Sequence, residues 1–292
     1  MSASAERGLR SRVLMPALFV LIWSTGFVVA RLAMPHAPPL SFLALRFLLS
    51  AMCLGLWVML TPAAWPADRA QWLHLVVLGL VTHALYLGCG WAAVKHGMGA
   101  GTMALIAGLQ PLLTALWQTM QGERLRAAQW AGLMLGLAGL ALVVGHKLGQ
   151  GEVTAFNLML GVLALLAISG GALYQKRFIR AADWRVAMLI QLAAAALPMF
   201  LLGGLEGEVI DWRPQVLLAL AWSVLALTLG ASSLFYLLLE RGEATRVSTL
   251  LYLVPPGAAL LAWALFSEAL GPWVWLGMAL SALGVFLVIR RT

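Results

Sequence analysis

Two groups with acid–base or hydrogen-bonding chemistry stand close together in one long apolar stretch. His83 and Tyr86 are three residues apart, so they share one face if the stretch is helical, and Gly90 follows four residues later. Because an imidazole titrates near neutral pH, His83 can bind a carboxylate or relay a proton. The alternative is a neutral ring that hydrogen-bonds to a neighbouring helix, and the sequence leaves both interpretations open.

Patterns typical of enzymes and metal sites are absent from the sequence. The five histidines stand singly, no acidic residue lies firmly within an apolar stretch, and there is no Gly-rich phosphate loop. Cys53 and Cys89 fall within apolar stretches and are expected to be packed thiols. We therefore predict no catalytic residues, no metal site and no cofactor.

Aromatic residues at depth are further candidates for contact with a ligand. Trp23, beside Ser24 and Thr25, lies midway along an apolar stretch, so it either lines a cavity or packs between helices. The other rings in this group are Trp91, Tyr174, Tyr236 and Tyr252. Such rings can stack on planar groups and attract an ammonium group over a ring face.

Prolines interrupt two other apolar stretches. Gln110 precedes Pro111, and Pro255 and Pro256 occupy the matching place in the second half. Each proline frees a backbone carbonyl, so Pro111, Pro255 and Pro256 are predicted hinges or ligand acceptors, or else static kinks. The amide of Gln110 is the expected direct contact there.

One arginine also lies inside an apolar stretch. Arg46 is six residues into its stretch, roughly 9 Å along a helix. We expect its side chain to reach back to the membrane surface. The alternative is that it anchors a carboxylate.

The composition places these residues in a bilayer. The chain is 62% hydrophobic and only 10% charged, with a mean hydropathy of +0.93. Since a crossing needs about 20 apolar residues, we predict an all-α integral membrane protein with ten transmembrane helices. They span residues 13 to 34, 40 to 60, 72 to 94, 98 to 119, 127 to 146, 154 to 175, 185 to 204, 215 to 239, 245 to 266 and 272 to 289.

The basic residues sort by side when the chain is threaded through ten crossings. The net charge is +8, and with a cytoplasmic N-terminus only four Lys or Arg fall outside: Arg31, Lys95, Lys147 and Arg213. Most of the others gather in the inner segments and at both termini. This is the positive-inside pattern, which explains the charge without a nucleic-acid partner.

The chain also repeats itself. Pro, Glu, Trp and Gly residues recur 145 positions apart: Pro111 with Pro256, Glu123 with Glu268, Trp130 with Trp275, Gly132 with Gly277 and Gly139 with Gly284. Residues 1–147 and 148–292 are therefore two copies of a five-helix unit within one membrane domain. An odd number of crossings per copy predicts inverted repeats, the architecture of alternating-access transporters.

Some residues do not repeat, and others have a structural interpretation. The copy has Ile168, Thr228, Ala231 and Pro255 where the first half has Trp23, His83, Tyr86 and Gln110. We therefore expect a symmetric frame around an asymmetric site. Glu123 and Glu268 precede the fifth and tenth helices and are interpreted as caps. Glycines in those two helices indicate close packing, either within the chain or in a dimer.

A family resemblance supports this organisation. The segment from Leu21 to Arg31, with Pro38, Pro39 and Arg46 after it, resembles the opening of the EamA domain of the drug/metabolite transporter superfamily. Both halves end similarly to that domain, with an acidic residue followed by a Gly-rich final helix. The resemblance implies a ten-helix carrier of the bacterial inner membrane that moves small metabolites outward. Within the superfamily, the chain is most similar to the YddG type of aromatic amino-acid exporter.

One departure from related proteins narrows the cargo. Small multidrug-resistance relatives use a membrane-embedded Glu in their first helix, and this chain has no acidic residue between Val13 and Met34. An embedded carboxylate is costly and is rarely present without a function, so its absence favours zwitterionic, neutral or aromatic cargo over polycations. We expect a secondary exporter of amino acids or similar metabolites, as a monomer or weak homodimer. The alternatives are a carrier of drugs, nucleosides or sugars, and a membrane enzyme or non-transporting subunit.

Overall fold

The computed structural model describes residues 3–122, 126–149, 151–180, 182–240, 253–268 and 271–289, and this part of the chain is helical with no strand. The helices up to the middle of the chain are α1 (Ala3–Ala33), α2 (Pro39–Leu60), α3 (Arg69–Gly79), η1 (Leu80–Leu85), α4 (Tyr86–Lys95), α5 (Ala100–Gly108), α6 (Gln110–Met120) and α7 (Ala127–Gly149). The remainder are α8 (Ala155–Phe178), α9 (Trp184–Gly203), α10 (Pro214–Trp222), η2 (Ser223–Ala231), α11 (Ser232–Glu240), α13 (Val254–Phe266) and α14 (Pro272–Ile289).

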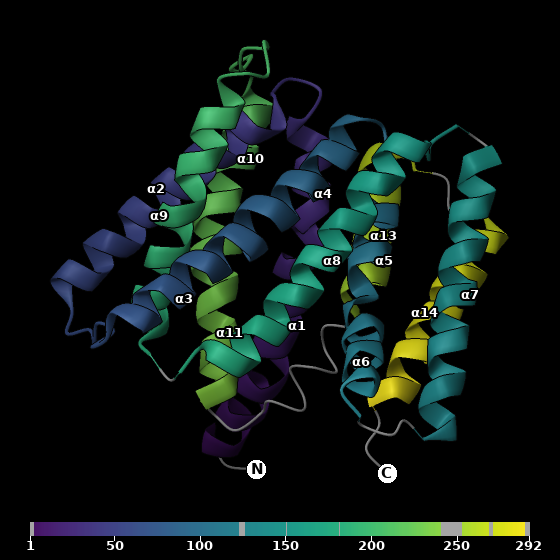
Figure 1. Ribbon diagram of the computed structural model, residues 1–292, viewed down its shortest axis with the longest axis horizontal. Coiled ribbons are helices and arrows are strands. Elements are labelled where there is room, and N and C mark those ends of the chain that lie inside the picture. Colours follow the sequence, from purple (N-terminus) through teal and green to yellow (C-terminus); the bar gives the residue numbers. More distant parts are fainter. Residues whose placement is uncertain are drawn as a thin grey trace.

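The described helices match the length and hydropathy of membrane crossings. Eight helical stretches are long and apolar enough to span a bilayer, and two shorter apolar helices cover Val254–Phe266 and Pro272–Val288. The protein is therefore an all-helical integral membrane protein. In Figure 1, α1 begins and α14 ends at the same end of the bundle, which we call the termini end.

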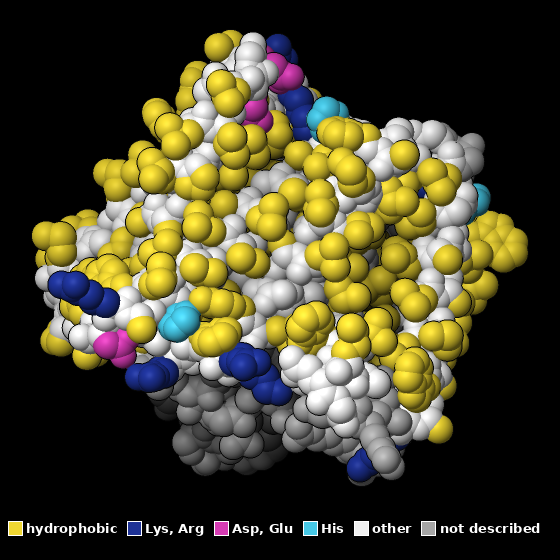
Figure 2. Space-filling model, viewed as in Figure 1, with side chains coloured by type: hydrophobic (Ala, Val, Ile, Leu, Met, Phe, Trp, Pro, Cys, Tyr) yellow, Lys and Arg dark blue, Asp and Glu magenta, His cyan; other side chains and the backbone are white. Residues whose placement is uncertain are grey.

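Side chains on the visible face follow this arrangement. Figure 2 shows hydrophobic side chains over the middle of the molecule, with Lys and Arg gathered along the edge towards the termini end. At the opposite end, carboxylates bridge separate helices: Glu208 pairs with Lys95 at 2.6 Å, and Glu206 accepts from the backbone amides of Leu40 and Ser41. The apolar belt thus lies between two polar ends, as a bilayer requires.

Helices α7 and α14 pack backbone against backbone. Gly132 faces Gly284 and Gly139 faces Gly277, so closely that an added Cβ at any of the four would meet the opposing carbonyl oxygen. Since an early residue of α7 meets a late residue of α14, the two helices are antiparallel. The glycines predicted to allow close packing therefore meet each other within one chain.

Two other helix pairs share this antiparallel relation. Ser41, at the start of α2, donates to the carbonyl of Gly203 at the end of α9. Gly108, at the end of α5, lies against Pro255 at the start of α13. Helices α2 and α9 are counterparts 145 residues apart, and α13 is the counterpart of α6, which follows α5 in the same predicted crossing.

The predicted breaks and caps are only partly as expected. The predicted crossing from 98 to 119 is interrupted at Leu109, between α5 and α6, directly before Gln110 and Pro111. Pro255 and Pro256 lie in the first turn of α13. Glu268 does not cap α14: it accepts from the backbone amide of Ala100 and so caps α5, because the two helix ends meet in space. Glu123 lies outside the described residues.

A larger side chain at the α7–α14 crossing should separate the two helices. We expect Gly139→Val to lower the stability of the purified protein by about 1–3 kcal/mol, the usual cost of overpacking a tight contact. Gly145→Val is the matched control, because an added Cβ at Gly145 meets nothing within 4 Å. Thermal unfolding in detergent measures both, and equal melting temperatures for the two variants would contradict the assignment.

Candidate functional site

The predicted histidine and aromatic site residues fall in three separate places. His83, Tyr86 and Trp91 lie on one continuous stretch, η1 and α4, beside Arg46 of α2. Trp23 and Tyr236 belong to a row of aromatic rings nearer the termini end. Tyr174 of α8 accompanies His74 of α3. Tyr252 lies outside the described residues.

Arg46 occupies the centre of the first group, which we call the Arg46 site: Arg46, His83, Tyr86, Trp91 and Gln191. The Arg46 residue is only 8% exposed, and its guanidinium carbon lies 5.6 Å from the centre of the Trp91 ring. The prediction that Arg46 reaches back to the membrane surface is therefore wrong. The Trp91 face attracts the guanidinium and holds it among the helices.

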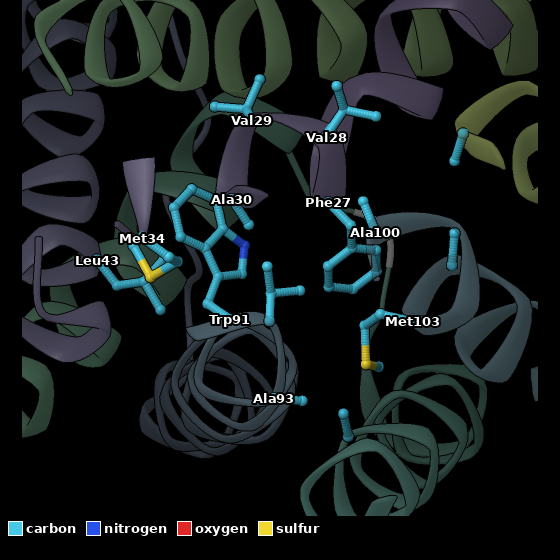
Figure 3. Close-up of a cluster of buried hydrophobic side chains, with 14 of the residues drawn as sticks. Phe27, Val28, Val29, Ala30, Met34, Leu43, Trp91, Ala93, Ala100 and Met103 are labelled. Carbon is cyan, nitrogen blue, oxygen red and sulfur yellow. The ribbon is translucent and has the colours of Figure 1, made fainter. Parts of the chain in front are cut away.

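Trp91 lies beneath Arg46 as part of the apolar core. Its ring stacks on Phe42 at 5.1 Å, and the residue is 1% exposed. Figure 3 shows the indole against α1 near Ala30, with Met34 and Leu43 beside it. Trp91 is thus a tightly packed apolar side chain beside Arg46 and does not line an open cavity.

His83 lies where the helix changes its hydrogen-bonding period. Segment η1 is π-helical, and such turns recur at functional sites in other proteins. The His83 ring lies near the side chain of Gln191 and meets Phe47 edge-on at 6.0 Å. Tyr86, one turn on, meets Phe27 edge-on at 6.2 Å.

The second half repeats this geometry with different side chains. Segment η2 is also π-helical, and Thr228, the counterpart of His83, donates to the carbonyl of Ser223 at 2.9 Å. Gln191, on α9, is the counterpart of Arg46 on α2. Each stands seven residues into its helix, so a cationic group in one copy matches a neutral amide in the other.

The aromatic row joins the two halves of the chain. Its centroid separations lie between 5.0 and 6.1 Å, in the order Phe19, Trp23, Phe235, Tyr236, Trp184 and Trp57. Trp23 is 37% exposed, so it packs on its neighbours and still presents a free edge. Arg185 lies over Trp57 at 5.9 Å, donates to Thr61 and binds Asp183. The hydrogen bonds from Arg185 hold the pKa of Asp183 below its ordinary value, which keeps that carboxylate charged.

Tyr174 and the prolines are placed away from the Arg46 site. The hydroxyl of Tyr174 lies 2.7 Å from Nδ1 of His74, and both rings contact Phe178. Pro255 and Pro256 line an apolar cavity with Gly108, Leu109 and Ser281, between α5, α13 and α14. Gln110 directly follows the break at Leu109.

Two buried hydroxyls were not singled out by the sequence analysis as candidates. Ser24 and Ser169 are 2% and 3% exposed, and neither Oγ has a hydrogen-bond partner. They are 145 residues apart, on α1 and α8. This matched spacing is the feature of the sequence that could have identified them. Unsatisfied hydroxyls at this depth are suited to contact a polar ligand.

Comparisons with known proteins agree on one class. The model of the EamA-like transporter family matches the chain twice, over residues 11–145 and 155–290. A probable amino-acid metabolite efflux pump of Salmonella typhimurium is 29% identical over 296 residues, which cover 94% of this chain and 95% of that protein.

Two further similarities cover most of the chain. The uncharacterized inner membrane transporter YedA of Escherichia coli is 26% identical over 288 residues, covering 96% of this chain and 92% of that protein. A crystal structure with 22% sequence identity matches with a TM-score of 0.65, over 97% of this chain and 99% of that one. The second similarity concerns the fold alone.

Proposed function

The chain belongs to the EamA-like transporter family and is a multi-pass transporter of the bacterial inner membrane, and we propose that it exports amino acids or similar small metabolites. Aromatic and other small neutral amino acids are the proposed cargo. The name of the Salmonella typhimurium relative describes it as a probable amino-acid metabolite efflux pump. The Arg46 site also combines charged, amide and aromatic groups, which suit a zwitterion with an apolar side chain.

The observation that carries the mechanism is the antiparallel packing of matched helices. Stretches 145 residues apart meet in opposite directions at Gly139–Gly277, Ser41–Gly203 and Gly108–Pro255. This supports two five-helix repeats, residues 1–147 and 148–292, with inverted orientation and ten crossings. Inverted repeats can exchange conformations, which opens a central site to one side of the membrane and then to the other.

The orientation in the membrane follows from charge. Arg69, Arg180 and Arg185 lie at the termini end of the described chain, whereas Glu206, Glu208 and Glu268 lie at the opposite end. The positive-inside rule then gives cytoplasmic termini.

The break at Leu109 and the start of α13 are the proposed hinges. Gly108 lies against Pro255, so these two interruptions meet across the repeat interface. A helix that lacks a backbone donor at depth bends more readily than an intact one. Movement at this contact would change the angle between α6 and α13 on either side of it.

Transport of amino acids tests the proposal directly. We expect proteoliposomes loaded with labelled phenylalanine, threonine or methionine to release at least one of them with saturable kinetics. We expect the same initial rate with and without an imposed pH gradient, since no carboxylate lies within the described membrane-spanning helices to carry a coupled proton. Vesicles that release none of the three but carry drugs, sugars or nucleosides would overturn the amino-acid assignment.

Substitutions at the site should lower transport more than folding. We expect His83→Ala and Trp23→Ala to reduce the efflux rate about tenfold, while the yield of folded protein stays nearly unchanged, because each removes a proposed contact for the cargo, at the Arg46 site or at the aromatic row. Trp65→Ala is the control: this ring is 50% exposed and stacks on Trp72 at the termini end. If yield and efflux fell to the same extent in the two site variants, His83 and Trp23 would have a packing role and no role in binding the cargo.

A further inference from the structure

Arg46 is a buried cation without a hydrogen-bond or ion-pair partner among the described residues. Its Nε has no hydrogen-bond partner, and no ion pair or hydrogen bond from the described residues reaches the guanidinium. The carboxylates whose side chains the structure describes lie at helix ends and in the segments between helices: Asp68, Glu152, Asp183, Glu206, Glu208, Asp211 and Glu268. Several of them are already engaged with other cations or backbone amides. The described chain therefore provides Arg46 with no counter-ion.

Arg46 cannot become neutral by losing a proton, because arginine stays charged in proteins. An uncompensated charge in a low-dielectric interior is costly, and such residues in membrane helices are usually functional. The Trp91 face offsets part of the cost through its ring electrons, but it accepts no N–H in the plane of the guanidinium. Among the described residues, the planar N–H groups therefore have no acceptor, and a bound ligand can provide one.

The neighbours of Arg46 indicate the charge of the group that Arg46 binds, and how many such groups the site holds. Gln191, the counterpart of Arg46, is neutral and lies near His83. A second cation is therefore missing where repeat symmetry would place one. The site has one fixed positive charge, which suits one anionic group on a small molecule, with the Trp91 and Phe42 rings providing an apolar floor.

We infer that Arg46 binds the carboxylate of the transported molecule, so that a carboxylate is required of the cargo. The inference rests on the proposed function and narrows it to small carboxylates, α-amino acids included. Two parallel N–H donors of a guanidinium match the two oxygens of a carboxylate, which gives direction as well as strength. An amine without a carboxylate then binds poorly, although its other groups fit.

Analogues of phenylalanine separate the two ends of the cargo. The assay is counterflow of labelled phenylalanine into proteoliposomes, with competition by 3-phenylpropionate, which lacks the amine, and by phenylalaninamide, which lacks the carboxylate. For the unmodified protein we expect 3-phenylpropionate to compete at least tenfold better than phenylalaninamide. Equal competition would overturn the inference.

Substitution of Arg46 assigns the preference to this residue. We expect Arg46→Gln to raise the KM for phenylalanine at least tenfold and to abolish the preference over the amide, with an intermediate result for Arg46→Lys. Arg213→Gln is the matched control, since it removes an arginine that is exposed and pairs with neighbouring Asp211. The control should keep the KM and the preference unchanged.

Folding is checked separately. Because Arg46 has no hydrogen-bond or ion-pair partner in the described chain, Arg46→Gln should leave the melting temperature in detergent unchanged or raised. Addition of 3-phenylpropionate should raise the melting temperature of the unmodified protein and not that of Arg46→Gln, whereas phenylalaninamide should raise neither. If both compounds raised the melting temperature of the unmodified protein, the inference would be overturned. This comparison does not depend on whether Arg46→Gln folds.

The outcomes distinguish the inference from the proposed function. Phenylalanine transport by Arg46→Gln with an unchanged KM and an unchanged preference over the amide would overturn only the role of Arg46. Vesicles of the unmodified protein that carry no carboxylate at all would overturn both.

Discussion

The backbone contact between α7 and α14 is the constraint on which the arrangement of the other helices depends. In a bilayer, lipid tails are as apolar as leucine, so helices associate through close packing and hydrogen bonds and not through burial from water. Gly132 with Gly284, and Gly139 with Gly277, bring two backbones together where a Cβ would prevent contact. Gly277 and Gly284 are the counterparts of Gly132 and Gly139, 145 residues later, so each contact is the repeat copy of the other. This one pair of helices therefore fixes the relation between the two halves. The pairs α2–α9 and α5–α13 follow the same relation.

A symmetric frame permits an asymmetric site because packing positions and polar positions are separate residues. The glycines at the α7–α14 crossing repeat, and so do the π-helical segments in the middle of the third and eighth apolar stretches. Within that frame, Thr228 satisfies its hydroxyl on its own helix, whereas its counterpart His83 is directed towards α9. Gln191 is neutral where Arg46 is charged. A zwitterionic cargo has two unlike ends, and a site with identical halves would not distinguish them.

Hydropathy and the repeat predicted much of the fold, since both are encoded locally. The stretch 40 to 60 corresponds to Pro39–Leu60, and the break expected near Pro111 occurs at Leu109. The direction of Arg46 was not predictable, because membrane depth does not tell whether a helix face meets lipid or another helix. Glu268 caps a helix distant in sequence, and Tyr174 finds its partner on α3. Both depend on which helix ends meet, which is a property of the tertiary arrangement.

The central claim is that two halves of opposite orientation exchange conformations around the Arg46 site. The most direct measurement uses paired spin labels at both ends of the protein in nanodiscs. One pair joins Leu148 and Val209, at the end away from the termini, and the other joins Ala67 and Gln121, at the termini end. The account predicts that phenylalanine shifts the two distance distributions in opposite directions, one pair closing as the other opens. Two distances that stay fixed, or that lengthen together, would contradict it.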